Sequence, residues 1–333
     1  MAKKRSQATE GSRYGIGEWY GHLISDLSAT ELKTFAEIGS SSFANVPCPF
    51  RISADPAAKC KKKGGVCTIR RHVKDDLGGI YLDGPFVTLC PSRFWDNNEI
   101  FSWIGSALLG NNQPNLVKEV QFLTSLSDDD KEEDGDGDAV GRIDTILVDP
   151  TDKKNWCALE IQAVYFSGPA MGTHLSQYNN DIGRIVFPNG SRRPDYRSSG
   201  PKRLMPQLQI KVPTLRRWGK KMAIVVDKPF FESLGKMTPV THVSNSDIAW
   251  FVVDYSTSNG SISLYKTVFT TLESSVEALT AGVPLSLESF EREVEGFLNG
   301  HDKRSRSKVV RLSSPVPSDD GGSTNQGGAE LPD

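Results

Sequence analysis

Residues 141–167 have the sequence GRIDTILVDPTDKKNWCALEIQAVYFS, which predicts two β-strands joined by a turn. The first strand, residues 143–148, is short and β-branched, and the Asp-Pro-Thr-Asp that follows is typical of a turn. Residues 156–165 alternate with a period of two, which places Glu160 and Gln162 on one face of the second strand. A carboxylate and an amide within a largely apolar strand break the local pattern, and such breaks often mark function.

Asp144 opens the first strand, so the hairpin can bring Asp144, Glu160 and Gln162 together. Neighbouring carboxylates repel each other, and Mg²⁺, a hard cation that prefers oxygen ligands, is a natural counter-ion. Such an ion would polarise a phosphodiester and lower the pKa of a bound water. The alternative reading of these residues is an edge hairpin whose polar side chains are solvated.

The composition allows one large core or two smaller ones in a chain of 333 residues. A formal charge of −2 would argue against a nucleic-acid-binding protein if the charge were evenly spread, but it is not. No apolar run is long enough to span a bilayer, and the basic start has no hydrophobic segment after it. We therefore expect a soluble protein that is not exported.

Four of the five cysteines fall within 43 positions, at Cys48, Cys60, Cys67 and Cys90. Lysines and glycines surround two of them, which favours thiolates and tight turns. Four thiolates can close a tetrahedral site around zinc or iron. The spacing contains no Cys-x-x-Cys pair, so scattered buried cysteines remain the alternative, and a disulfide scaffold is not expected.

Residues 184–221 contain eleven basic residues and one acidic residue, a local charge of about +10 directly after the hairpin. Such a surface suits DNA, because Lys and Arg neutralise phosphates and Arg can read guanine. An ordinary solvated face is the alternative. The side chains that we expect to contact DNA are Arg184, Arg192, Arg193, Arg197, Lys211, Arg216 and Arg217.

Apolar spacing predicts most of the remaining elements. We expect two short helices within residues 14–35, helices at 100–109, 113–126, 204–218, 271–281 and 287–298, and strands at 222–226, 248–253 and 261–269. Residues 1–13 and 301–333 are predicted to be disordered. The acidic residues 127–138 predict a flexible loop rather than an EF-hand, because Gly141 stands where the calcium-binding glutamate is required.

Several motifs occur together and in a fixed order. Cys-Pro-Phe at Cys48, Gly-Val-Cys at Cys67, Cys-Pro at Cys90 and Leu-Glu-Ile-Gln around Glu160 resemble the NotI family of type II restriction endonucleases, over roughly residues 15–300. The resemblance implies an α/β (α+β) fold with a PD-(D/E)XK core, a central mixed sheet flanked by helices. The expected regions are N-terminal helices at 1–45, a four-cysteine metal-binding region at 46–100, the nuclease core at 101–300 and a tail at 301–333.

The resemblance also implies the site residues. Cys48, Cys60, Cys67 and Cys90 would hold a structural iron, with zinc as the alternative, and Asp144 and Glu160 would hold Mg²⁺. Gln162 occupies the position of the family fold's lysine, so it can orient water but cannot supply positive charge. Lys211, Arg216 and Arg217 are candidates for that charge. Glu119, on the predicted helix 113–126, is a candidate for an additional ligand.

Two choices are left open at this point. Asp149 is the alternative to Asp144 as first ligand, and Asp144 is preferable because Asp149 lies in the turn. The expected function is Mg²⁺-dependent cleavage of double-stranded DNA at a palindrome, compatible with a guanine-rich target, by a homodimer in the bacterial cytoplasm. A cognate DNA methyltransferase is expected in the same system. The competing functions are a non-catalytic DNA-binding protein with a structural metal, and another metal-dependent DNA repair nuclease.

Overall fold

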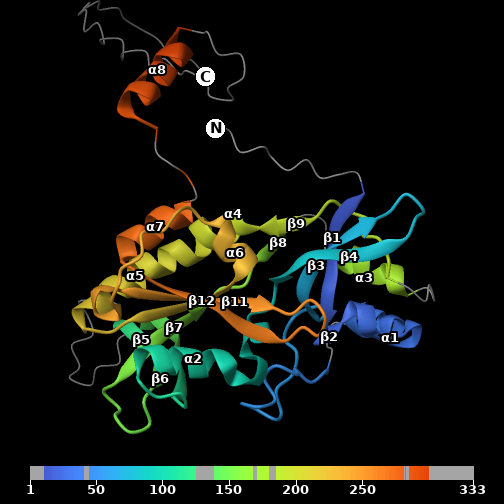
Figure 1. Cartoon of the computed structure of the whole chain (residues 1–333), viewed down its shortest axis with the longest axis horizontal. Helices are drawn as coiled ribbons and strands as arrows, with labels where there is room; N and C mark the ends of the chain where they lie inside the picture. The colour runs from blue at the N-terminus through green and yellow to red at the C-terminus, as the bar shows by residue number, and fades with distance from the viewer. Residues whose placement is uncertain are drawn as a thin grey trace, which may run out of the picture. The chain divides into compact units, whose positions relative to one another are not determined.

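The protein is described by a computed structural model that covers residues 11–40, 45–124, 139–167, 171–179, 185–280, 282 and 285–299. The chain divides after Gly282 into two compact units. The first unit contains the sheets and most of the helices (Figure 1), and the second contains helix α8 (Leu287–Leu298). Within the described ranges, no helix combines the length and the apolar character needed to cross a membrane.

A six-stranded mixed sheet forms the centre of the first unit, with the strand order β12-β11-β10-β7-β6-β5. Strand β10 runs parallel to β7 and β11, and the other pairs are antiparallel. All six residues of β10 are buried, as expected for a strand covered on both faces. The strands are β5 (Asn115–Thr124), β6 (Ala139–Val148), β7 (Trp156–Ile161), β10 (Met222–Asp227), β11 (Ile248–Tyr255) and β12 (Ile262–Thr270).

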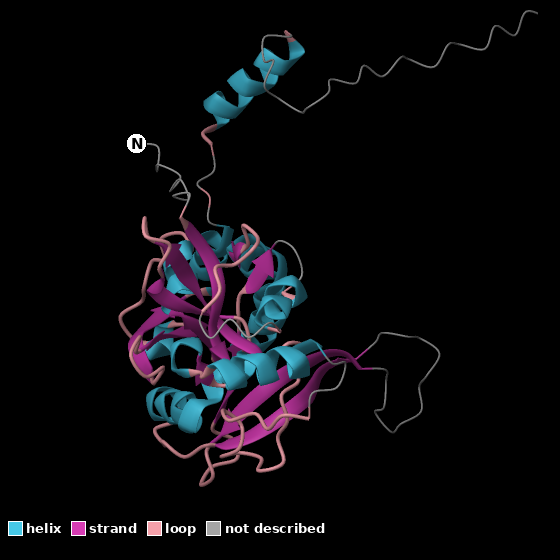
Figure 2. Ribbon diagram, turned by 90° about the vertical axis from the view of Figure 1, so that its right-hand side faces the viewer, coloured by secondary structure: helices cyan, strands magenta, loops and turns pink. Residues whose placement is uncertain are grey.

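Helices cover both faces of this sheet. Helix α2 (Glu99–Leu108) belongs to the core on one face, and α5 (Met205–Arg217) and α7 (Leu272–Thr280) belong to the core on the other. The β5–β6 hairpin extends beyond β7, because β6 pairs with β7 only from Thr145 to Val148 (Figure 2).

A second, antiparallel sheet has the order β2-β1-β3-β4. Its strands are β1 (Ser12–Trp19), β2 (His22–Leu23), β3 (Val66–Lys74) and β4 (Ile80–Thr88), and α1 (Ala29–Ser40) follows β2. A small sheet pairs β8 (Tyr165–Ser167) with β9 (Arg193–Asp195). The short α-helices are α3 (Gly172–Leu175), α4 (Tyr196–Ser199) and α6 (Lys228–Ser233), and a π-helical turn, Gly200–Leu204, leads into α5.

Buried polar contacts connect the two large sheets. Arg93, 1% exposed, donates to the Glu18 carboxylate of β1 at 2.8 Å and to the carbonyl of Gly260, between β11 and β12. Asp227, at the end of β10, accepts hydrogen bonds from the Thr88 N–H of β4 at 2.6 Å and from the Phe230 N–H of α6 at 2.9 Å. Each contact joins segments that lie far apart in the sequence.

Two predicted helices are wrong. Residues 14–19 belong to β1, where Gly15 and Gly17 disfavour a helix. Both faces of this strand are buried where it pairs with β3, so its apolar residues do not alternate and their spacing resembled that of a helix. Residues 113–126 mostly form β5, and the left-handed φ of Glu119, +56°, interrupts the strand pattern that would have identified it. In both places tertiary pairing overrides local propensity.

The other predicted elements are confirmed to within a few residues, including the hairpin strands, the buried strands β10 and β11, and helices α2, α5, α7 and α8. Ser28 caps α1, with reciprocal contacts to Glu31. The second hairpin strand ends at Ile161 rather than at residue 165, and residues 12–13 lie in β1. The predicted disorder of residues 1–10 and 301–333 and the acidic loop 127–138 lie outside the described residues.

Candidate active site

The hairpin of β6 and β7 brings the two predicted carboxylates together. Thr145 pairs with Leu159, and continuing this antiparallel register by one residue sets Asp144 opposite Glu160. The Glu160 residue is only 5% exposed, whereas the Asp144 side chain is 58% exposed. One carboxylate is therefore embedded beneath a helix and the other faces solvent.

Lys211 of α5 completes this cluster. Its Nζ lies 2.9 Å from Oε2 of Glu160 and 3.8 Å from Oδ1 of Asp144. Nζ also donates to Oε1 of Gln207, one helical turn earlier, at 2.8 Å. Of the three residues named from the sequence as sources of positive charge, Lys211 is the one that this structure brings to both carboxylates.

The position of Lys211 follows from the packing of α5. Leu208, Val212 and Leu215 form the buried stripe of the helix, and Lys211 lies within it at 6% exposure. A buried ammonium normally requires a charged partner, and Glu160 provides one. The charged residue thus interrupts an apolar helix face at the place where that face meets the carboxylates.

Burial raises the pKa of Glu160. The nearby Lys211 ammonium opposes this rise, and the Asp144 carboxylate adds to it. A carboxyl group with a raised pKa binds a proton at higher pH, and it must lose that proton to bind a metal. The occupancy of a cation site at Glu160 is consequently expected to depend on pH.

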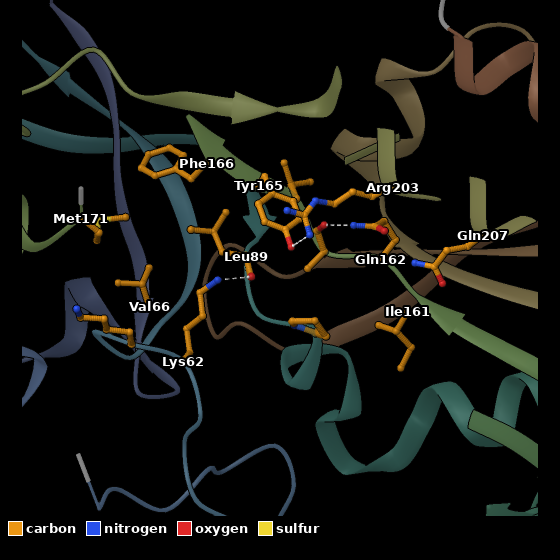
Figure 3. Close-up of a pocket in the computed structure, with 14 residues that line it drawn as sticks. Lys62, Val66, Leu89, Ile161, Gln162, Tyr165, Phe166, Met171, Arg203 and Gln207 are labelled. Carbon is orange, nitrogen blue, oxygen red and sulfur yellow. Dashed lines mark hydrogen bonds between the residues drawn. The ribbon is translucent and has the colours of Figure 1, made fainter. Parts of the chain in front are cut away.

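Gln162 lies directly after β7. Its backbone N–H donates to the carbonyl of Val225, which continues the pairing of β7 with β10. Its side-chain amide donates to the carbonyl of Ala163 and lines a cavity of about 550 Å³ together with Gln207 (Figure 3). Because Gln207 also contacts Lys211, Gln162 stands at the boundary between the carboxylate cluster and this cavity.

Asp149 has a different role from Asp144. Its carboxylate accepts hydrogen bonds from Thr151, Asn155 and Asn111, which hold the turn between β6 and β7. The bonds from Thr151 lower the pKa of Asp149. A carboxylate with these partners is a structural residue of the turn, which favours Asp144 as the first ligand.

Glu119 is not on a helix, as predicted, but on β5. Lys118 pairs with Thr145 and Val120 with Ile143, so the register sets Glu119 opposite Asp144. Its φ of +56° is uncommon for a residue other than glycine, and such strain often accompanies function. The strand therefore brings Glu119 to the same row of the sheet as Asp144 by a route that the sequence pattern did not indicate.

The predicted DNA-contacting arginines have different environments. Arg193, Arg197 and Arg217 are exposed, whereas Arg216 is paired with Asp247 and Glu273. Arg192 is 3% exposed, and its Nη1 contacts the sulfur of Met171, so this side chain points inward and not toward a DNA surface. Arg184 lies outside the described residues.

The four cysteines come from paired backbone segments. Cys48 donates its N–H to Ala58, Cys60 donates to Val46, and Cys90 donates to Cys67. Burial raises the pKa of the Cys60 thiol, and the neighbouring Cys90 and Cys48 thiols raise it further. In the ranges that the structure describes, no three or more His, Cys, Asp or Glu residues are arranged to hold a metal ion. A formed four-cysteine centre is thus not shown.

A mixed α/β fold with two carboxylates on neighbouring strands and a helix lysine beside them is compatible with a phosphodiester-cleaving enzyme. The family model for restriction endonuclease NotI matches residues 35–265, so the chain belongs to the NotI restriction endonuclease family. Comparison with curated proteins finds no match. Membership implies the restriction-endonuclease-like fold, with which the central mixed sheet agrees.

The chain is therefore a type II restriction endonuclease, a site-specific deoxyribonuclease that acts on DNA. Restriction endonucleases generally use divalent metals. The non-catalytic DNA-binding protein and the repair nuclease, which the sequence left open, are not the class that the family indicates.

Sequence reasoning did not identify Gln207 as a neighbour of the cluster, nor Lys62, Lys63 and Arg203 as residues that line the adjoining cavity. One signal for Gln207 was available, because residues four positions apart share a helix face and Gln207 precedes Lys211 by four. Lys62 and Lys63 are adjacent in one segment and Arg203 lies in another, and no local pattern relates the two segments.

Proposed function

We propose that Asp144 and Glu160 bind the catalytic Mg²⁺ and that Lys211 supplies the positive charge that Gln162 lacks. The observation that carries this proposal is the position of the Lys211 ammonium, within 2.9 Å of Glu160 and 3.8 Å of Asp144. The carboxylate oxygens are a donor set that suits a hard cation. When bound, Mg²⁺ would polarise the scissile phosphate and acidify a water molecule.

The remaining roles follow from the surroundings of each side chain. Lys211 has three N–H donors, of which Glu160 and Gln207 engage two, and the third is available to Asp144 or to a phosphate oxygen. Gln162 orients the attacking water through its amide. Glu119 is aligned with Asp144 across β5 and β6, but the described residues do not group these three acidic side chains around one ion, so we assign the ion to Asp144 and Glu160.

We also propose that Cys48, Cys60, Cys67 and Cys90 hold one structural metal ion, iron or zinc. The backbone pairings of these residues and the mutual influence of their thiols support this assignment. Four thiolates leave no open coordination position, so the role is structural. Residues 46–100 would then be a metal-binding region attached to a nuclease core at 101–300, with a basic DNA-binding segment at 184–221.

Cleavage of both strands at a palindrome requires two active sites related by a two-fold axis, so we propose a homodimer. Exposed Arg193, Arg197 and Arg217 would contact DNA, in agreement with a guanine-rich site. A partner methyltransferase and a place in the bacterial cytoplasm belong to the same proposal. Sedimentation equilibrium tests the dimer, and a fully active protein of monomeric mass on its DNA site would contradict it.

Digestion of a large plasmid and a phage genome tests the catalytic proposal. With Mg²⁺ we expect discrete fragments, and none with excess chelator. Asp144→Ala is expected to abolish cleavage while DNA binding persists, because Asp144 is exposed and its loss should not disturb packing. Asp152→Ala, which removes an exposed carboxylate from the same hairpin, is the matched control. Full cleavage by Asp144→Ala would refute the assignment.

A further inference from the structure

The cavity beside Gln162 is walled by side chains from several separate parts of the chain (Figure 3). Lys62 and Lys63 come from the segment before β3, Arg203 from the turn before α5, and Gln162 from the segment directly after β7. At about 550 Å³, it is of the size class that holds small organic ligands.

The charge of this cavity is one-sided. Lys62, Lys63 and Arg203 line it, and its lining contains no Asp or Glu among the described residues. The Lys62 ammonium donates to the carbonyl of Leu89 at 2.9 Å, which fixes its position and leaves two donors free. Three cations without a counter-ion around one hollow favour an anionic ligand.

Arg203 is held in place by an aromatic ring. Its guanidinium lies 3.7 Å from the ring centroid of Tyr165, and it donates to the Tyr165 hydroxyl. Stacking orders the guanidinium before a ligand arrives, which lowers the entropy lost on binding. The remaining donors of this planar group suit a phosphate, which arginine can bind with two parallel hydrogen bonds.

The cavity adjoins the proposed catalytic centre. Gln207 lines the cavity and accepts a hydrogen bond from Lys211, which contacts Glu160. Apolar side chains, among them Leu89, Ile161 and Val164, form part of the lining. A group that combines an anion with an apolar body and lies next to a scissile phosphate is the neighbouring nucleotide of the same DNA strand.

We infer that this cavity binds a deoxynucleotide adjacent to the scissile bond, with its phosphate on Lys62, Lys63 and Arg203. The inference rests on the proposed function of Asp144 and Glu160 for the identity of the scissile position. It assigns to the cavity a substrate contact outside the predicted DNA-binding arginines.

Binding measurements test this inference without any cleavage. A duplex is first selected from random sequences by binding to the Asp144→Ala protein, and its affinity is measured at several salt concentrations without Mg²⁺. In the same background, Lys62→Met and Arg203→Met should each lower the slope of log affinity against log salt, by about one at most, because the three cations share one phosphate. Lys33→Met, an exposed lysine of α1, is the matched control and should leave the slope unchanged.

Single methylphosphonate linkages then locate the contact. One neutral linkage next to the scissile position should weaken binding about tenfold or more, the value of a hydrogen bond to a charged group. The same linkage should have a smaller effect in Arg203→Met, because only Lys62 and Lys63 then remain to contact that phosphate. An unchanged salt slope in both cavity variants, or a linkage effect of the same size in Arg203→Met as in its parent protein, would overturn the inference. Loss of cleavage in Asp144 variants bears only on the proposed function.

Discussion

Lys211 is the residue that brings a positive charge to both proposed metal ligands. Lys211→Met preserves the length of the side chain and removes the charge between Glu160 and Asp144. We expect single-turnover cleavage to fall by about 10²–10³-fold, the magnitude typical of losing one preorganised electrostatic contact. Rapid-quench measurements at saturating protein would give this rate, and the anisotropy of labelled DNA would report binding.

The control for this variant is Lys33→Met, which removes a helical lysine that is exposed. Lys211 also compensates a buried carboxylate, so its loss is expected to destabilise the fold. The melting temperature of the variant must therefore lie well above the temperature of the cleavage assay. A Lys211→Met variant that cleaves at the wild-type rate would exclude Lys211 from catalysis. The positive charge that Gln162 lacks would then have to come from another residue.

The second residue-scale prediction concerns pH. Because burial raises the pKa of Glu160, protons should compete with the metal at higher pH than for an ordinary glutamate. Below this pKa, the Mg²⁺ concentration for half-maximal cleavage should rise by about tenfold per pH unit. Lys211→Met should move the transition to higher pH, because Lys211 lowers the pKa of Glu160.

Metal binding should improve as pH rises, whereas the stability of the metal-free protein should fall. A carboxyl group whose pKa is raised in the folded state retains a proton that the unfolded chain has released, so stability falls as pH rises from the ordinary value through the raised one. Thermal melts of Glu160→Gln and of the wild type across this range measure the difference. Identical pH dependence in the two proteins would contradict the assignment of the shift to Glu160.

At the scale of elements, the Glu18–Arg93 pair fastens β1 to the segment before α2 and to the β11–β12 connection. Both side chains are at most 3% exposed. Arg93→Met leaves the Glu18 carboxylate buried without its partner, and the expected loss is about 3–5 kcal/mol in the free energy of unfolding. Urea titrations of the variant and the wild type give this value.

The matched control is Arg71→Met, which breaks the pair of Arg71 with Asp83 on the surface. Its side chains are 45% and 44% exposed, so the loss should not exceed about 1 kcal/mol. Equal destabilisation by the two variants would mean that the buried pair does not connect the sheets as the structure indicates.

At the scale of the whole molecule, the four-cysteine proposal predicts one tightly bound metal ion per chain. Plasma mass spectrometry of the purified protein would identify it as iron or zinc. Cys67→Ala should lose the ion and lower the melting temperature, because Cys67 is buried and its segment pairs with Cys90.

Cys157→Ala is the control for the metal measurement. Cys157 is also buried, but it lies alone on β7, and burial raises its pKa to about 12, so it does not provide a thiolate at neutral pH. We expect this variant to keep its metal content. A wild-type protein without bound metal after anaerobic purification would refute the four-cysteine site.

The sequence by itself determined the features that depend on local patterning. The alternation of residues 156–161 and the turn at Asp149 predicted the hairpin, and the period of two within it placed Glu160 where the structure has it. The continuous apolar runs predicted β10 and β11, because strands buried on both faces need no alternation. The motif order also pointed to the family that the comparison confirmed.

Only the tertiary structure decided which distant segments meet. The local apolar spacing of β1 and β5 predicted helices. Both segments form strands instead, because pairing with neighbouring strands stabilises them. The sequence named Lys211 among three candidates, but the packing of α5 on the sheet selected it by burying its ammonium against Glu160. The cavity of Lys62 and Arg203 likewise has no sequence signal, since its walls come together only when the sheets and α5 pack.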